Sequence, residues 1–325
     1  MQEENRGVWI FSEVSQLAFE LLGKGSLLAK ALRSELVAIS IGSAEGNEDY
    51  IKHGADRVLT AADPALANFH VDTYADALSE LATEHKPDVI MIGATRNGLE
   101  LAPRLAERLK VGCVTEATRI ELDADKKYLL MDRLTLGGNL VETHVSKVKP
   151  QIATVARGLF SSLPADGSRK GQVVKVEPKI KAPSTKLLEK KPKEAKGVRL
   201  ADASVIVSFG RGIRKKEDIA MVEKLADAVG GVIGCSRPIA EDLGWLSEEQ
   251  YIGLSGQKVS PRLYFACGIS GQIQHLTGVR NSKIIISINN DPKAPIFEFT
   301  DYGIVADLYQ ILPVLTETIK QLRKS

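Results

Sequence analysis

The sequence predicts an α/β protein of two domains: an N-terminal domain on a mostly parallel sheet with antiparallel additions, and a Rossmann-like C-terminal domain. Short apolar runs alternate with helix-length amphipathic segments in both halves, which is typical of a parallel sheet covered by helices. The length of 325 residues exceeds one typical domain and suits two. A basic, proline-containing stretch divides the two halves.

The first half opens with strands and helices in alternation. We expect buried strands at Gly7–Phe11, Leu36–Ser40, Arg57–Leu59 and Pro87–Ile92. Helices are expected at Gln16–Leu32, Tyr74–Glu84 and Leu99–Leu109, with Gly23 and Gly25 as candidate interruptions of the first. Four more strands follow without helices between them, at Thr115–Leu122, Tyr128–Leu134, Leu140–Val145 and Gln151–Val155. Because only turns join these four, we expect them to be antiparallel additions to the sheet.

Residues 161–200 differ in composition from the rest, with 11 Lys or Arg against 4 Asp or Glu, and with four prolines. We place the domain boundary there, with domains at 1–192 and 193–325 and a basic connecting segment at 161–192. The segment has no aromatic residue to stack on bases, so no nucleic-acid partner is expected. A solvated connection or a docking surface for an acidic protein fits better, and Val173–Val176 is a candidate edge strand within it.

The overall composition argues against several classes of protein. A net charge of +2 does not favour a polyanion partner. Cys113, Cys235 and Cys267 lie far apart without CxxC spacing, so we expect neither a metal site nor a disulfide framework. No apolar run reaches about 18 residues, and the first residues show neither a secretory nor an arginine-rich leader. We therefore expect a cytoplasmic protein with no membrane span.

The second half again alternates strands and helices. Strands are expected at Ser204–Ser208, Gly231–Gly234, Leu263–Ala266, Lys283–Ile288 and Ile296–Phe299, and helices at Lys215–Val229, Gln272–Thr277 and Ile304–Leu322. Four strands end in polar residues, namely Arg211, Ser236 with Arg237, Ser270 and Asn289. Because parallel strands end at a shared edge of the sheet, we expect a ligand site there. The set has no paired carboxylates and no nucleophile with a base, so we expect a site that holds a cofactor without catalytic residues.

The stretch Gly253–His275 contains two glycine turns of a kind found in ligand sites. Gly253 and Gly256 bracket Ser255, and a second glycine turn, Gly268–Gly271, lies between a strand and a helix start. This order aims free backbone N–H groups at an anion. Because the GxGxxG fingerprint is incomplete, an ordinary glycine-rich connection remains an alternative.

The second half also contains several short motifs that resemble one known family when they are taken as a set. They are Gly210-Arg-Gly212, Ser236-Arg-Pro238, Gly253-x-Ser-Gly256, Leu263-Tyr-x-Ala-x-Gly-Ile-Ser-Gly-x-Ile-Gln-His275 and Asp301-Tyr-Gly-Ile-Val-Ala-Asp307. The set resembles the electron transfer flavoprotein alpha subunit, and Gly93-Ala-Thr95 and Pro150-Gln-x-Ala-Thr154 extend the likeness more loosely to the first half. The resemblance implies a C-terminal FAD domain, a beta-subunit partner, and electron exchange with a flavin dehydrogenase of the acyl-CoA dehydrogenase kind.

The resemblance also implies residue roles. It puts Arg237 beside the isoalloxazine ring, Ser255 near flavin N5 and His275 near the pyrimidine carbonyl, where a guanidinium and an imidazole favour an anionic, one-electron-reduced flavin. The expected FAD-binding residues are Arg211, Ser236, Arg237, Ile252, Gly253, Leu254, Ser255, Ser270, Gly271, Gln272, Ile273, Gln274, His275, Asn289, Asp307 and Leu308. A packed helix residue remains the alternative for His275, and a surface ion pair the alternative for Arg237.

Two positions depart from the family pattern. Leu254 and Gln257 stand where the family commonly has Gln and Lys, so we expect altered flavin potentials and partner contacts. FAD binding is expected to survive, because Ser255 keeps its hydroxyl. Three functions stay open: a mobile electron carrier subunit, a component of an NADH-dependent electron-bifurcating enzyme, and a generic nucleotide-binding α/β protein.

Overall fold

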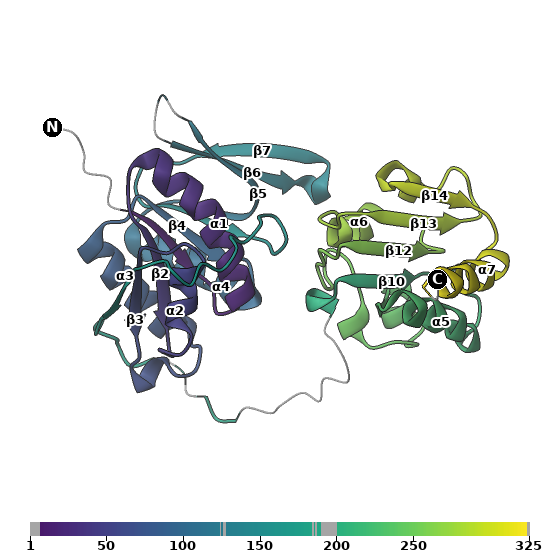
Figure 1. The fold of residues 1–325 in the computed structure, drawn as a ribbon, viewed down its shortest axis with the longest axis horizontal. Coiled ribbons are helices and arrows are strands. Elements are labelled where there is room, and N and C mark those ends of the chain that lie inside the picture. The colour runs from purple at the N-terminus through teal and green to yellow at the C-terminus, as the bar shows by residue number, and fades with distance from the viewer. Residues whose placement is uncertain are drawn as a thin grey trace. The chain divides into compact units, whose positions relative to one another are not determined.

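The computed structural model of the chain describes residues 7–123, 125, 128–183, 185, 187–189 and 200–323. The chain divides into two compact units, Met1–Lys190 and Lys191–Ser325, each with its own sheet (Figure 1). Helices accompany parallel strands in both, and the predicted α/β fold class is confirmed.

The first unit holds a nine-stranded sheet in the order β7-β6-β5-β8-β4-β1-β2-β3-β9. Its strands are β1 (Val8–Phe11), β2 (Leu36–Ile41), β3 (Arg57–Ala61), β4 (Val89–Gly93), β5 (Cys113–Asp123), β6 (Tyr128–Thr135), β7 (Leu140–Val145), β8 (Gln151–Val155) and β9 (Gln172–Lys175). Its helices are α1 (Ser15–Leu32), α2 (Asn47–Lys52), α3 (Val71–His85) and α4 (Arg96–Leu109). Alternate side chains of each central strand enter opposite cores, one against α1 and the other against α3 and α4.

Two expectations for this unit were wrong. Strand β8 is not an antiparallel addition, because it lies between β4 and β5 and runs parallel to both. All five of its residues are buried, as a central parallel strand requires, so only β6 and β7 extend the sheet antiparallel. Helix α1 is continuous through Gly23 and Gly25. A Cβ at Gly23 would lie 2.1 Å from the Ser161 carbonyl oxygen, so this glycine serves close packing rather than a helix break.

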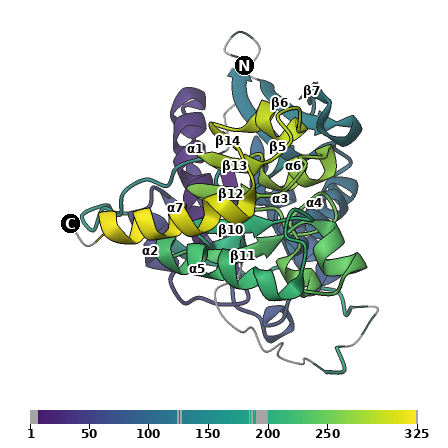
Figure 2. The same cartoon turned by 90° about the vertical axis from the view of Figure 1, so that its right-hand side faces the viewer.

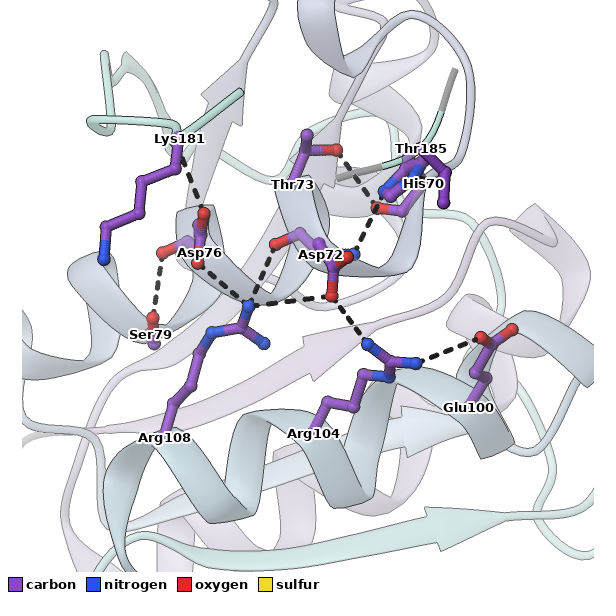
Figure 3. Close-up of polar contacts among 10 residues, drawn as sticks. All are labelled: His70, Asp72, Thr73, Asp76, Ser79, Glu100, Arg104, Arg108, Lys181 and Thr185. Atoms are coloured by element: carbon purple, nitrogen blue, oxygen red, sulfur yellow. Dashed lines mark hydrogen bonds and ion pairs between the residues drawn. The ribbon is translucent and has the colours of Figure 1, made fainter. Parts of the chain in front are cut away.

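The basic connecting segment lies on the first unit over most of its described length. Strand β9 pairs in parallel with β3 at the sheet edge, as the candidate edge strand had suggested. Further along, the Lys181 backbone N–H donates to the Asp76 carboxylate (3.3 Å), and Thr185 Oγ1 lies 2.6 Å from His70 Nε2 (Figure 3). Arg108 joins the same group through a 3.0 Å ion pair with Asp76. The segment is therefore anchored to α3 rather than solvated throughout, because its backbone donors find carboxylates there.

The second unit holds a five-stranded, fully parallel sheet in the order β11-β10-β12-β13-β14. Its strands are β10 (Val205–Phe209), β11 (Val232–Cys235), β12 (Leu263–Cys267), β13 (Ile285–Asn289) and β14 (Tyr302–Val305), and its helices are α5 (Ile219–Val229), α6 (Ile273–Val279) and α7 (Leu308–Leu322). Helices α5 and α7 lie side by side over one core, whereas α6 packs into the core of the opposite face (Figures 1 and 2).

The end of the second unit differs from expectation. Ile296–Phe299 is not a strand but part of a 3-10 turn, Pro295–Phe299, in which proline occupies the first position and Ile296 is fully buried. The last strand is instead β14, which pairs with β13. The final helix consequently begins at Leu308, four residues later than expected, where the Asp307 carboxylate accepts a 3.0 Å hydrogen bond from the Tyr309 N–H.

Candidate functional site

The carboxyl ends of the second unit's strands meet at one edge of the sheet. Phe209 of β10 is level with Cys267 of β12 and with Cys235 of β11. The loops beyond them are joined by backbone hydrogen bonds, because the Gly210 N–H donates to the Cys267 carbonyl (3.0 Å) and the Gly268 N–H to the Ile288 carbonyl (2.8 Å). The expected convergence of strand ends is therefore present.

Glycines let these loops approach one another closely. Gly268 has φ +61°, and a Cβ there would lie 2.6 Å from the Cα of Gly212. Gly271 has φ +84°, and a Cβ there would lie 2.3 Å from the Ile296 nitrogen. Both positions need glycine for the backbone conformation and for space, which leaves backbone edges free to face a ligand.

The loops enclose a cavity of about 600 Å³ at this edge, within the usual range for cofactor sites. Eleven of the sixteen predicted residues line it: Arg211, Ser236, Arg237, Ile252, Ser270, Gln272, Gln274, His275, Asn289, Asp307 and Leu308. The other five do not line it: Gly253, Leu254, Ser255, Gly271 and Ile273. Nine lining residues were not predicted as site residues: Gly210, Gly212, Arg214, Pro238, Tyr251, Gly268, Ile269, Asn290 and Ala306.

Ser255 does not line the cavity but contacts Tyr251, which does. Its side chain is exposed, and its Oγ lies 3.1 Å from Oη of Tyr251, which is buried and lines the cavity. The adjacent Leu254 is 47% exposed, and its N–H donates to the Gln274 carbonyl (2.7 Å), which ties this loop to α6. Tyr251, rather than Ser255, is thus the residue of this loop that lines the cavity with Ile252.

Three arginines stand at the cavity, and Arg237 is tied to a carboxylate. Its Nε donates to Glu241 Oε2 at 2.6 Å within a short π-helical turn, Pro238–Asp242. This ion pair raises the pKa of Arg237, although the side chain is 62% exposed. Arg214 instead lies over the Tyr309 ring, 5.3 Å from its centroid, and Arg211 is exposed. Together they give the cavity a cationic rim that suits an anionic ligand.

His275 places a buried imidazole ring at the cavity. It is 7% exposed, and its Nε2 lies 2.8 Å from Tyr264 Oη. Its Nδ1 is buried and makes no hydrogen bond of standard geometry to the described residues. Burial lowers the pKa of His275 to about 4, so the ring is neutral at pH 7. The Ile252 carbonyl lies close enough to raise the pKa of the ring, against the larger effect of burial.

Known proteins match both units. Residues 9–181 match the electron transfer flavoprotein domain, and residues 199–280 match the electron transfer flavoprotein FAD-binding domain. The electron transfer flavoprotein subunit alpha of Thermoanaerobacterium thermosaccharolyticum is 42% identical over 98% of this chain and 99% of its own length. The chain belongs to the electron transfer flavoprotein alpha-subunit family. The resemblance identified from the sequence is confirmed.

Other relatives of this alpha subunit cover most of its length. The subunit alpha of Clostridium acetobutylicum is 39% identical over 97% of both chains. Subunit LctC of the lactate dehydrogenase (NAD(+),ferredoxin) of Acetobacterium woodii is 35% identical over 97% of this chain and 77% of that subunit. Family membership makes this chain an electron transfer flavoprotein subunit and implies a beta-subunit partner. Within the described ranges, no helix has the length and apolar character to cross a membrane.

The residues that sequence reasoning missed have a common signal. Gly210 and Asn290 are immediate neighbours of predicted residues in the strand-end loops, and Gly268 directly follows β12, so the rule that identified Arg211 could have included them. Tyr251 gave no comparable signal, since it lies far from any strand end in the chain. Its position depends on an isolated β-bridge with Cys235, which only the folded structure reveals.

Proposed function

We propose that this chain is the FAD-binding alpha subunit of a heterodimeric electron transfer flavoprotein, which takes electrons from a flavin dehydrogenase and passes them to an acceptor. The observation that carries the proposal is the cavity at the strand-end edge of the second unit, with close-packed glycine loops, three arginines and the buried His275 ring in its lining. The lining supplies no nucleophile with a base, which suits a subunit whose redox chemistry comes from its cofactor.

The residues present fit FAD in three respects. The glycine loops admit a pyrophosphate, because their backbones approach closely where any Cβ would collide. The cationic rim, Arg211, Arg214 and Arg237, offsets the negative charge of the phosphates and of a reduced ring. The neutral His275 ring lines the cavity, where it would contact the flavin ring without adding a second charge beside the arginines.

When bound, FAD supplies one- and two-electron chemistry, and the protein's residues bind and tune it. We assign Ser270 and Gln272 to the phosphate and ribityl region, and Asn289 and Asp307 to the adenosine end. The Asp307 carboxylate already accepts from the Tyr309 N–H, so its second oxygen remains for a ligand hydroxyl. Arg237 provides positive charge near the ring, partly neutralised by Glu241.

The test is to purify the chain with its beta subunit, denature the complex, and identify and count the released flavin. We expect at least one FAD per heterodimer. Gly210→Val should lose the flavin of this chain, because a Cβ at position 210 would lie 2.6 Å from the Gly268 carbonyl oxygen. Gly112→Val is the matched control, since a Cβ there meets nothing within 4 Å. Release of FMN alone, or no flavin after reconstitution with FAD, would contradict the proposal.

An electron-bifurcating complex is the second candidate. The observation that favours it is the relative LctC, whose name couples lactate dehydrogenation with NAD(+) and ferredoxin. Mixing the purified complex with NADH alone separates the two. A simple carrier keeps its flavin oxidised until its dehydrogenase is added, whereas rapid bleaching of the flavin by NADH would assign this chain to an enzyme complex.

A further inference from the structure

The ring of His275 is hydrogen-bonded to a tyrosine that lies behind the cavity wall. Tyr264 is the second residue of β12 and is fully buried, and it is not among the cavity-lining residues. Its Oη is 2.8 Å from Nε2 of His275, which belongs to α6 on that face of the sheet. The two groups form a buried polar pair in a core where the apolar residues Ile206, Leu276 and Val279 also pack.

Both groups of this pair are neutral, so a single proton occupies the bond between them. Burial raises the pKa of the Tyr264 phenol far above its usual range and lowers that of His275 to about 4. Either the phenol O–H donates to Nε2, or an Nε2–H donates to the phenol oxygen. In the first arrangement the ring proton is on Nδ1. In the second it is on Nε2, and Nδ1 carries no proton.

Counting hydrogen bonds favours the first arrangement. In the second, the Tyr264 O–H would need another acceptor. Ser208 on the adjacent strand is near enough to lower the pKa of Tyr264, but its Oγ makes no hydrogen bond of standard geometry with the described residues. In the first, only the Nδ1–H is left over, and the Ile252 carbonyl is near enough to raise the pKa of His275, as an acceptor beside an N–H does. The second arrangement therefore leaves one more buried group unsatisfied.

We propose that Tyr264 is a positioning residue whose O–H fixes His275 as the neutral Nδ1–H tautomer, and so holds an uncharged ring in the cavity wall with its N–H beside the Ile252 carbonyl. Only the contact of this ring with a flavin rests on the proposed function. Tyr264 acts through His275 and does not itself reach the ligand.

The tautomer can be measured without any flavin. The chain is produced with ¹⁵N-labelled histidine rings, assembled with its unlabelled beta subunit, and freed of flavin. Long-range ¹H–¹⁵N spectra then identify the protonated ring nitrogen, with His275→Gln assigning the signal. We expect Nδ1–H in the wild type. In Tyr264→Phe the tautomers should mix, with Nε2–H readily detected.

The matched control is Ser287→Ala, which removes a buried hydroxyl and its 2.6 Å hydrogen bond to Thr300 from the neighbouring strand β13. It should leave the His275 tautomer unchanged. In FAD titrations, Tyr264→Phe should bind about 3- to 10-fold more weakly than the wild type, as expected for one neutral hydrogen bond. Ser287→Ala should bind as the wild type does.

Two results would overturn the proposal: Nε2–H in the wild type, or an unchanged Nδ1–H in Tyr264→Phe. The wild-type spectrum decides the tautomer even if Tyr264→Phe does not fold. Because that spectrum is recorded without flavin, a failure of FAD to bind would remove the proposed function while leaving the role of Tyr264 standing.

Discussion

Replacing Gly271 with alanine should lower the free energy of unfolding of the second unit. The size of the loss can be estimated from the backbone conformation and the contacts at this position. The residue has φ +84°, and a Cβ there would lie 2.3 Å from the Ile296 nitrogen and 2.4 Å from its Cα. The left-handed backbone costs a non-glycine residue roughly 1–2 kcal/mol. The clash adds about 1–3 kcal/mol, because the buried Ile296 backbone must move by about 1 Å to restore contact distance. The total is a loss of about 2–5 kcal/mol in the free energy of unfolding.

Gly244→Ala separates the two contributions. Gly244 lies in the same unit with φ +59°, but a Cβ there meets nothing within 4 Å. This control should lose only the backbone contribution, about 1–2 kcal/mol.

Native-state amide exchange of β10 and β12 measures both losses, because these central amides exchange when the unit opens. Exchange should accelerate by roughly 30-fold or more in Gly271→Ala and by about 5- to 30-fold in Gly244→Ala. Equal acceleration in the two variants would show that position 271 is not crowded, and the reasoning about the glycine loops would fail.

Three further outcomes are expected. The three cysteines should react with a thiol reagent at pH 8 at least about 100-fold more slowly in the folded protein than in the unfolded chain. The reason is that burial raises their pKa values to about 11 or 12. Equal rates in the folded and unfolded chains would refute this. Asp76→Asn should speed amide exchange around Lys181, whose N–H the carboxylate accepts, and unchanged exchange would show that the anchor is elsewhere. Glu241→Gln should raise the potential of the bound flavin by tens of millivolts by freeing the charge of Arg237, and Arg237→Ala should lower it; spectroelectrochemical titration would expose a shift of the wrong sign.

The layers of the fold could be predicted from periodicity, but the pairing of strands could not. The apolar runs at β4 and β8 indicate buried strands, yet nothing local tells whether Gln151–Val155 runs parallel or antiparallel to its neighbours. That choice depends on which edge of the sheet is free when the chain returns. Ile296–Phe299 was mistaken for a strand because a short apolar run next to a proline fits either a strand or a tight turn, and burial of Ile296 decided between them.

The candidate site followed from strand-end chemistry more reliably than from loop motifs. Arg211 and Ser270 lie two and three residues beyond the ends of β10 and β12, Asn289 is the last residue of β13, and parallel pairing brings all three to one cavity. Ser255 lies in a loop with no strand immediately before it, so its distance from the edge depended on tertiary packing. There Tyr251 occupies the wall and Ser255 stands behind it.

The most direct test of the account is amide exchange of the flavin-free complex with and without FAD. The account predicts protection in the cavity loops, at residues 210–214, 236–238, 268–275 and 306–308, and none in α4 of the first unit. Protection confined to other parts of this chain or to the beta subunit, with the four loops unchanged, would contradict the claim that this cavity holds the flavin.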